Sequence, residues 1–254
     1  MNRFVEWFAG VHDRRPVLFL HSLGTDHRLW QYQQEAVEGR TYGWMDARGH
    51  GASQEHCPVS VELWVEDIRE VIEQTARKDV VLCGISMGGV QALAFANKYP
   101  HLVGGLILAD TFLRIPLHEQ EAKIAGTAGK AAELGMDRYA DEYLDATLTK
   151  SDSAMAIRPH LRQAISGMSL AMYVASARAC FTADVSPVFS GIPTLVLIGE
   201  HDFKTPRERA DEIVASIPDA RLQVIPNAAH LSNVDNPAAF NRAIQSFLEG
   251  VDEQ

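Results

Sequence analysis

The chain has 254 residues, 46% of them hydrophobic and 22% charged, so it can bury a sizeable core in one domain or in one domain with an insertion. Its formal net charge of −10 argues against a surface that binds nucleic acid and against a basic patch for anionic membranes. No apolar run is long enough to span a bilayer, and the first ten residues contain no apolar signal-peptide core. Three cysteines without pairing or zinc spacing indicate reduced thiols, and we expect a cytoplasmic protein.

Strand and helix patterns alternate through the first 111 residues. In chain order the sequence predicts an edge strand over 4–9, a turn over 11–16, a buried strand over 17–20, a helix over 29–37, a strand over 42–46, a helix over 59–77 capped by Ser60, a strand from 80, a helix over 90–96 and a strand over 106–109. Alternation with short connections is typical of a parallel sheet covered by helices on both faces.

The pattern changes between about Phe112 and Pro187, where strand-like runs disappear. Four helices are predicted there, over 119–134, 136–148, 153–165 and 170–181. Helices inserted between two sheet strands predict a cap over the carboxyl edge of the sheet, where ligands bind in open α/β sheets. Alternatively, these helices only cover the sheet and do not control access to a ligand site.

The sheet pattern then resumes. The predicted elements are a buried strand over 193–199, a helix over 206–217, a last strand over 221–225 and a closing helix over 236–248. The fold class is therefore α/β, with a mostly parallel central sheet. We expect a core domain of residues 1–111 and 188–254 and a helical cap of residues 112–187.

The sequence Gly-x-Ser-x-Gly spans Gly84 to Gly88, directly after a predicted buried strand. A Cβ atom on either glycine would collide across so tight a strand-to-helix turn. The turn would place the Ser86 hydroxyl at a helix N-terminus, where backbone N–H groups point outward. Ser86 is therefore the candidate nucleophile.

A serine hydroxyl needs a neighbouring base, and the base needs an acid to orient it. His230 and Asp202 each follow a predicted sheet strand, so both can meet Ser86 at one edge of a parallel sheet. Asp110 also ends a strand and stays open as a displaced acid. His201 competes as the base, but it is badly placed because it adjoins Asp202.

Acyl transfer also needs N–H donors for the oxyanion that develops. The N–H of Met87, directly after the nucleophile, is the first candidate. The loop after the strand over 17–20 should supply the second, for which we expect the N–H of Leu23, with Ser22 as the alternative.

Other polar residues near the predicted strand ends receive structural interpretations. We expect His21 to brace its loop through hydrogen bonds, and Arg48 and His50 to hold the neighbouring loop. The sequence contains no His-x-x-x-His pair, no Gly-x-Gly-x-x-Gly and no Walker loop, so it predicts neither a metal site nor a bound cofactor.

Four stretches resemble the α/β-hydrolase superfamily across nearly the whole chain: 84–89, 46–53, 199–202 and 227–230. Within it, further stretches are similar to the 3-oxoadipate enol-lactonases of bacterial aromatic degradation, namely 21–26 with Trp30, 199–202 with Thr205 and Pro206, and 230–233 with Asn236 and Pro237. Related esterases and hydrolases of ring-cleavage pathways share parts of these motifs.

This resemblance implies an α/β-hydrolase fold and the opening of an enol-lactone to an oxo-dicarboxylate by a Ser-His-Asp acyl-enzyme mechanism. It also implies a small-molecule substrate that carries a carboxylate, so the pocket needs a cation. The candidate cations in the cap are Arg114, Arg138, Arg158, Arg162 and Arg178. The family's cap commonly contributes a tryptophan to the pocket, whereas all four tryptophans of this chain precede the cap.

Several alternatives remain open at this point. A carboxylesterase and a carbon–carbon-bond hydrolase of ring-cleavage products are the nearest ones. A non-catalytic ligand receptor on a hydrolase scaffold belongs to another class, as does a cofactor-free lyase or oxygenase that uses His230 as its base. The sequence does not indicate an oligomeric state.

Overall fold

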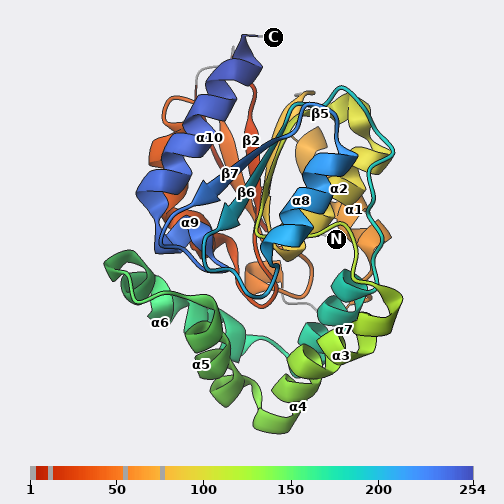
Figure 1. Cartoon of the computed structure of the whole chain (residues 1–254), viewed down its shortest axis with the longest axis vertical. Helices are drawn as coiled ribbons and strands as arrows, with labels where there is room; N and C mark the ends of the chain where they lie inside the picture. The colour runs from red at the N-terminus through yellow and green to blue at the C-terminus, as the bar shows by residue number, and fades with distance from the viewer. Residues whose placement is uncertain (1–3, 11–13, 54–56, 75–77, 254) are drawn as a thin grey trace.

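A seven-stranded sheet forms the centre of the molecule in the computed structural model, which describes residues 4–10, 14–53, 57–74 and 78–253 (Figure 1). Its order is β1-β3-β2-β4-β5-β6-β7, and β1 alone runs antiparallel to its neighbour. The strands are β1 Val5–Phe8, β2 Val17–Leu20, β3 Tyr42–Met45, β4 Val80–Ile85, β5 Val103–Ala109, β6 Thr194–Gly199 and β7 Arg221–Ile225.

Continuous apolar sequence explains the central strands. Every residue of β2, β4 and β6 is buried, as expected for parallel strands that helices cover on both faces. β5 begins three residues earlier than the predicted strand over 106–109, because Gly104 and Gly105 weaken the apolar signal at its start. A Cβ atom on Gly104 would lie 2.3 Å from the carbonyl oxygen of Asp79, so the close approach of the two segments requires glycine there.

Helices cover both faces of this sheet. α1 (Val61–Glu73), α2 (Met87–Lys98) and α8 (Arg207–Ser216) lie on one face, and α10 (Pro237–Asp252) lies on the other (Figure 1). The Ser60 hydroxyl accepts a hydrogen bond from the N–H of Leu63, which confirms the predicted N-cap of α1. The chain order of strands and helices is that of a mostly parallel α/β-hydrolase sheet, as predicted.

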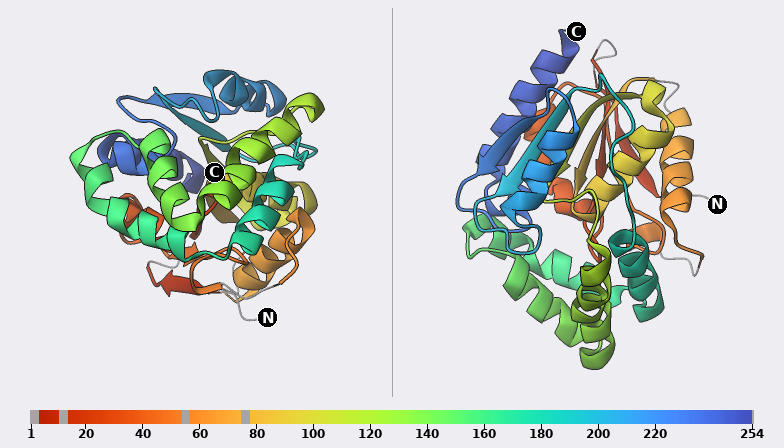
Figure 2. Two further views of the ribbon diagram at one scale, coloured as in Figure 1. Left: turned by 90° about the horizontal axis from the view of Figure 1, so that it is seen from below. Right: turned by 45° about the vertical axis from the view of Figure 1, so that its right-hand side comes forward.

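Apart from the short helix α9 (Ser232–Asp235), the remaining α-helices lie together below the carboxyl ends of the strands (Figures 1 and 2). We call them the cap helices: α3 (Leu117–Ile124), α4 (Lys130–Leu134), α5 (Met136–Thr147), α6 (Asp152–Gly167) and α7 (Leu170–Phe181). Residues Ala125–Gly129 join α3 to α4 as one π-helical turn. The division into a core domain and a separate cap domain stays a prediction.

Two predicted helices also differ from the structure. Residues 29–37 form two short 3₁₀ helices, His27–Gln33 and Glu35–Val37, in place of one α-helix. Side-chain hydrogen bonds hold the first of them, because Gln33 donates to the carbonyl of Asn233 and to the side chain of Asn241. The predicted helix over 59–77 ends at Glu73, and its positions 75–77 lie outside the described residues, as do positions 11–13 of the predicted turn.

In the described ranges, no single helix is both long and apolar enough to cross a bilayer. α6 and α7 pass the same test of length and composition only as a pair, and they are bent by 99° at their junction.

Candidate active site

Ser86 lies in the sharp turn between β4 and α2. Its backbone has φ 54° and ψ −114°, a left-handed conformation that is strained for a non-glycine residue. A Cβ atom on Gly84 would lie 2.2 Å from the carbonyl oxygen of Gly88, and one on Gly88 would lie 2.0 Å from that of Leu20. Both glycines are therefore required by the close approach of backbone segments, for the reason that the sequence predicts.

The turn is held by hydrogen bonds to the neighbouring strand. The N–H of Ser86 donates to the carbonyl of Ala109 at 2.9 Å, and the hydroxyl of Thr111 donates to the carbonyl of Ser86 at 2.7 Å. These contacts fix the backbone of Ser86 directly after the carboxyl end of β4.

His230 lies between Ser86 and Asp202. Its Nε2 is 3.0 Å from the Ser86 hydroxyl oxygen, and its Nδ1 is 2.9 Å from Oδ2 of Asp202. The carboxylate accepts from Nδ1–H, which leaves Nε2 as the unprotonated nitrogen that can accept from the serine. The three residues predicted from the ends of β4, β6 and β7 thus form one hydrogen-bonded line.

The surroundings of Asp202 favour its ionised form. Burial opposes ionisation, but the charge of His230 and hydrogen bonds from His230 and Thr205 outweigh it, so the pKa of Asp202 is lowered. Oδ1 accepts from the N–H groups of Lys204 and Thr205, and Oδ2 accepts from the Thr205 hydroxyl as well as from His230. A charged acid in this position can orient the histidine and stabilise an imidazolium.

Asp110, the alternative acid, has other partners. Its Oδ1 accepts from the N–H of Gly199, and its Oδ2 accepts from the N–H and hydroxyl of Ser232. Burial raises its pKa well above the ordinary range, and the charge of Asp202 raises it further. Asp110 therefore connects the loop that precedes Asp202 to the helix that follows His230.

His201, the competing base, is 53% exposed at its side chain, and its Nε2 lies 3.9 Å from Oε2 of Glu200.

The loop after β2 is braced by buried histidine contacts, as the sequence predicts. His21 accepts at Nε2 from the N–H of Ala47, so its Nδ1 carries the proton and donates to the carbonyl of Ser22 at 2.8 Å. Thr25 donates to that same carbonyl from both its N–H and its hydroxyl. The bracing positions Leu23, which borders the same cavity as Ser86.

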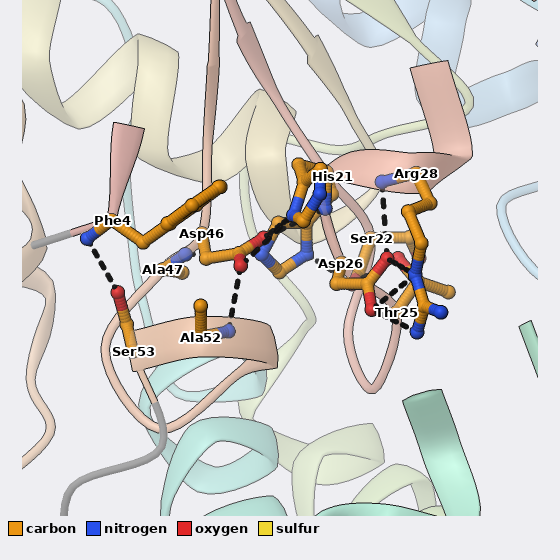
Figure 3. Close-up of polar contacts among 11 residues, drawn as sticks. Phe4, His21, Ser22, Thr25, Asp26, Arg28, Asp46, Ala47, Ala52 and Ser53 are labelled. Carbon is orange, nitrogen blue, oxygen red and sulfur yellow. Dashed lines mark hydrogen bonds and ion pairs between the residues drawn. The ribbon is translucent and has the colours of Figure 1, made fainter. Parts of the chain in front are cut away.

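The buried carboxylate of Asp46 lies beside this loop (Figure 3). Asp46 accepts from the N–H groups of His27 and Ala52, and Nδ1 of His27 lies 3.0 Å from both of its oxygens. The neighbouring loop is held by Arg48, which donates two hydrogen bonds of 2.7 Å to Asp67. Burial is the main cause that lowers the pKa of His50 to about 3, and the charge of His21 lowers it further. A histidine that stays neutral in this way agrees with a structural role.

A cavity of about 260 Å³ lies between the strand ends and the cap helices. Ser86, His230 and Leu23 border it from the sheet side. Phe112, between β5 and α3, and Phe181, the last residue of α7, also border it. The π-helical turn contributes Gly126 and Thr127. Ser86, His230 and an apolar surface that suits a small ligand thus share one cavity.

The cations that border this cavity are lysines. Of the described residues around it, Lys123 and Lys204 carry positive charge, and none of the five candidate arginines borders it. Arg158 and Arg162 instead contact Asp141 on the outside of the cap helices, and Arg114 donates to the hydroxyl of Ser186. The expectation of an arginine was therefore wrong for this cavity.

Sequence reasoning missed both lysines for different reasons. Lys204 lies two residues after Asp202, so its place near the site could have been inferred from spacing alone. Lys123 gives no such signal, because the direction of a side chain on a cap helix depends on how that helix packs. Across the described ranges, no group of three or more His, Cys, Asp or Glu side chains could hold a metal ion.

The parallel sheet, the Gly-x-Ser-x-Gly turn and the order Ser86, Asp202, His230 are together the arrangement of α/β hydrolases. The sequence comparison agrees: residues 17–243 match the alpha/beta hydrolase family, and the chain belongs to that family.

The individual relatives have low sequence identity to this chain. 3-oxoadipate enol-lactonase 2 of Acinetobacter baylyi is 28% identical, with 94% of this chain and 91% of that protein covered. Among solved structures, a thermophilic esterase from Thermogutta terrifontis superposes with a TM-score of 0.86 at 28% identity, over 98% of this chain and 93% of that one. The enol-lactonase from Burkholderia xenovorans LB400 superposes at 0.85 and 24% identity, over 97% of each chain, which shows the shared fold.

Proposed function

We propose that this chain is a serine hydrolase that opens a lactone or ester through an acyl-enzyme, with Ser86 as nucleophile, His230 as base and Asp202 as orienting acid. The observation that carries the proposal is the continuous line of hydrogen bonds from Ser86 through His230 to Asp202. Each contact lies within the reach that proton transfer requires.

The reaction proceeds in two halves. The Ser86 hydroxyl oxygen bonds to the substrate carbonyl carbon while Nε2 of His230 takes its proton. As the carbonyl is restored, the bond to the leaving oxygen breaks and His230 returns the proton to the leaving group. His230 then removes a proton from water, the water oxygen attacks the acyl carbon, and Ser86 leaves with the proton from His230.

Two backbone N–H groups are proposed to stabilise the oxyanion, those of Met87 and Leu23. Met87 is the first residue of α2, where helix geometry leaves N–H groups without partners inside the helix. Leu23 reaches the same cavity from the braced loop after β2. In other serine hydrolases the loss of one such donor costs about 3–4 kcal/mol of transition-state stabilisation.

The leading substrate that we propose is 3-oxoadipate enol-lactone, in the cytoplasmic breakdown of aromatic compounds. Similarity to the enol-lactonase of Acinetobacter baylyi over 94% of this chain supports it. Opening this ring is favourable because the leaving enolate becomes a ketone. A carboxylesterase is the second candidate, supported by the 28% identity to the thermophilic esterase.

Replacement of the nucleophile tests the reaction class. Ser86→Ala is expected to lower kcat by about a million-fold on any accepted lactone or ester, by analogy with other serine hydrolases. Ser216→Ala, on the exposed surface of α8, is the control and should leave the rate unchanged. Near-normal turnover by Ser86→Ala would rule out the nucleophile and favour base-only lyase chemistry at His230.

The substrate is tested separately. Wild-type protein should hydrolyse the enol-lactone with a higher kcat/KM than simple aryl esters such as p-nitrophenyl butyrate. The reverse order would favour the carboxylesterase.

A further inference from the structure

Two lysines from different parts of the chain border the cavity of Ser86 and His230. Lys123 lies on α3, one of the cap helices, and Lys204 lies in the loop between β6 and α8. Both side chains are half-buried. Two ammonium groups therefore share a small space that aromatic side chains also border.

No carboxylate in the described part of the chain forms an ion pair with either lysine. Nζ of Lys123 donates to the carbonyl oxygen of Lys204 at 2.7 Å, and Nζ of Lys204 lies 4.8 Å from the centre of the Tyr143 ring. The nearby carboxylate of Asp202 already accepts from His230, Thr205 and the backbone. The two positive charges thus lack an anionic partner from the protein itself.

Such a pair costs free energy in the absence of a ligand. Burial lowers the pKa of both lysines, and the charge of Lys123 further lowers that of Lys204. An anion placed between them would offset the desolvation and the mutual repulsion at once. A carboxylate suits this position because its two oxygens can accept one charge-assisted hydrogen bond from each ammonium.

We propose that Lys123 and Lys204 form an anion subsite that binds a free carboxylate of the substrate while the scissile carbonyl lies at Ser86. The assignment rests on the proposed function, since it concerns the same cavity. It narrows the substrate class to small lactones or esters that carry a carboxylate on the acyl part. Because one lysine belongs to the cap helices and the other to the sheet side, the bound carboxylate would also connect the two.

An alternative role for the lysines can be separated from this one. If their charge acted only on Asp202, and through it on His230, loss of either lysine would affect every ester alike. A subsite for carboxylate predicts instead an effect that depends on the charge of the substrate.

A matched pair of esters provides the test. Mono-p-nitrophenyl glutarate carries a free carboxylate, and methyl p-nitrophenyl glutarate has the same chain and leaving group without the charge. We expect wild-type protein to prefer the charged ester in kcat/KM. Lys123→Met and Lys204→Met should each reduce that preference about tenfold to a hundredfold, the usual effect of losing a hydrogen bond to a charged group.

Two further variants serve as controls. Lys98→Met, an exposed lysine of α2 that pairs with Glu66, should keep the wild-type preference. Lys204→Arg retains the charge and should keep more of the preference than Lys204→Met. An unchanged ratio of the two kcat/KM values in Lys123→Met and Lys204→Met would overturn the proposal.

Binding without turnover distinguishes failure of the subsite from failure of the nucleophile. Glutarate binding to the Ser86→Ala protein is measured by calorimetry, with and without the two Lys→Met changes. Weaker binding after these changes supports the subsite even if Ser86 is not the nucleophile. Equal binding overturns the subsite and leaves the assignment of Ser86 untouched.

Discussion

Nε2 of His230 lies 3.0 Å from the hydroxyl oxygen of Ser86, although 144 residues separate them in the chain. The contact depends on the parallel arrangement of β4 and β7, which directs both carboxyl ends to the same edge of the sheet. Any change that shifts one of these ends should therefore affect the reaction before it affects the fold.

Asp202→Asn should lower kcat by about ten-thousand-fold with little loss of stability. The amide has nearly the shape of the carboxylate, but it cannot stabilise an imidazolium or hold His230 in the tautomer with Nδ1–H. Steady-state kinetics on an aryl ester measure the loss, and Asp219→Asn, in an exposed turn, is the control. A loss of tenfold or less would show that another residue orients the base.

Asp110 should make stability depend on pH. Because its pKa is higher in the folded protein than in the unfolded chain, its contribution to the free energy of unfolding is full below about pH 3.9 and is lost as the pH rises toward the folded pKa. Asp110→Asn removes this titration.

Urea unfolding of both proteins between pH 5 and 8 measures the effect. The stability of wild type relative to Asp110→Asn should fall as pH rises, by at most about 1.4 kcal/mol per pH unit. A difference that is constant over this range, or that grows in favour of wild type, would contradict the assigned direction of the pKa shift.

Gly84→Ala should destabilise the protein by about 1–3 kcal/mol or more, because its Cβ atom would overlap the carbonyl oxygen of Gly88. Gly250→Ala in α10 makes the same chemical change where no atom lies within 4 Å of the new Cβ. That control should raise stability by up to about 0.5–1 kcal/mol. Urea midpoints of the two variants that move in the same direction would argue against steric overlap as the cause.

Arg48→Met should cost about 3–5 kcal/mol, because it removes one partner of a buried ion pair and leaves the charge of Asp67 in the interior. Combining it with Asp67→Leu should recover part of the loss. Arg69→Met removes exposed ion pairs with Glu66 and Glu73, so thermal unfolding should show little change. Equal shifts in midpoint for Arg48→Met and Arg69→Met would refute the importance of burial.

The sheet and the Ser-His-Asp geometry were predictable because their signals are local. The buried strands are short apolar runs, and Gly84 and Gly88 mark the turn around Ser86 through the steric limits of a few neighbouring atoms. Asp202 and His230 follow from the same rule applied to the ends of two other strands. The sequence left Asp110 open as a displaced acid, and the hydrogen-bond partners of the two carboxylates in the structure favour Asp202.

The substrate side of the cavity was less predictable. The predicted helix over 119–134 contains Lys123, but helical periodicity alone does not say which of its faces meets the sheet. The five arginines were reasonable candidates by charge, yet Arg158 and Arg162 face acidic partners on the neighbouring cap helix. Long-range packing, which local sequence does not encode, decides which charges enter the cavity.

The π-helical turn at Ala125–Gly129 makes the direction of Lys123 sensitive to the deletion of one residue. A π-helical turn is equivalent to one extra residue in an α-helix, and one residue corresponds to a rotation of roughly 100° about the helix axis. α4 packs against α5, and α3 packs against α7. Loss of a single codon here would join α3 and α4 into one regular helix and change the direction of Lys123 relative to α4. If Lys123 binds a substrate carboxylate as proposed, one in-frame deletion would change the substrate preference and leave Ser86, Asp202 and His230 unaltered.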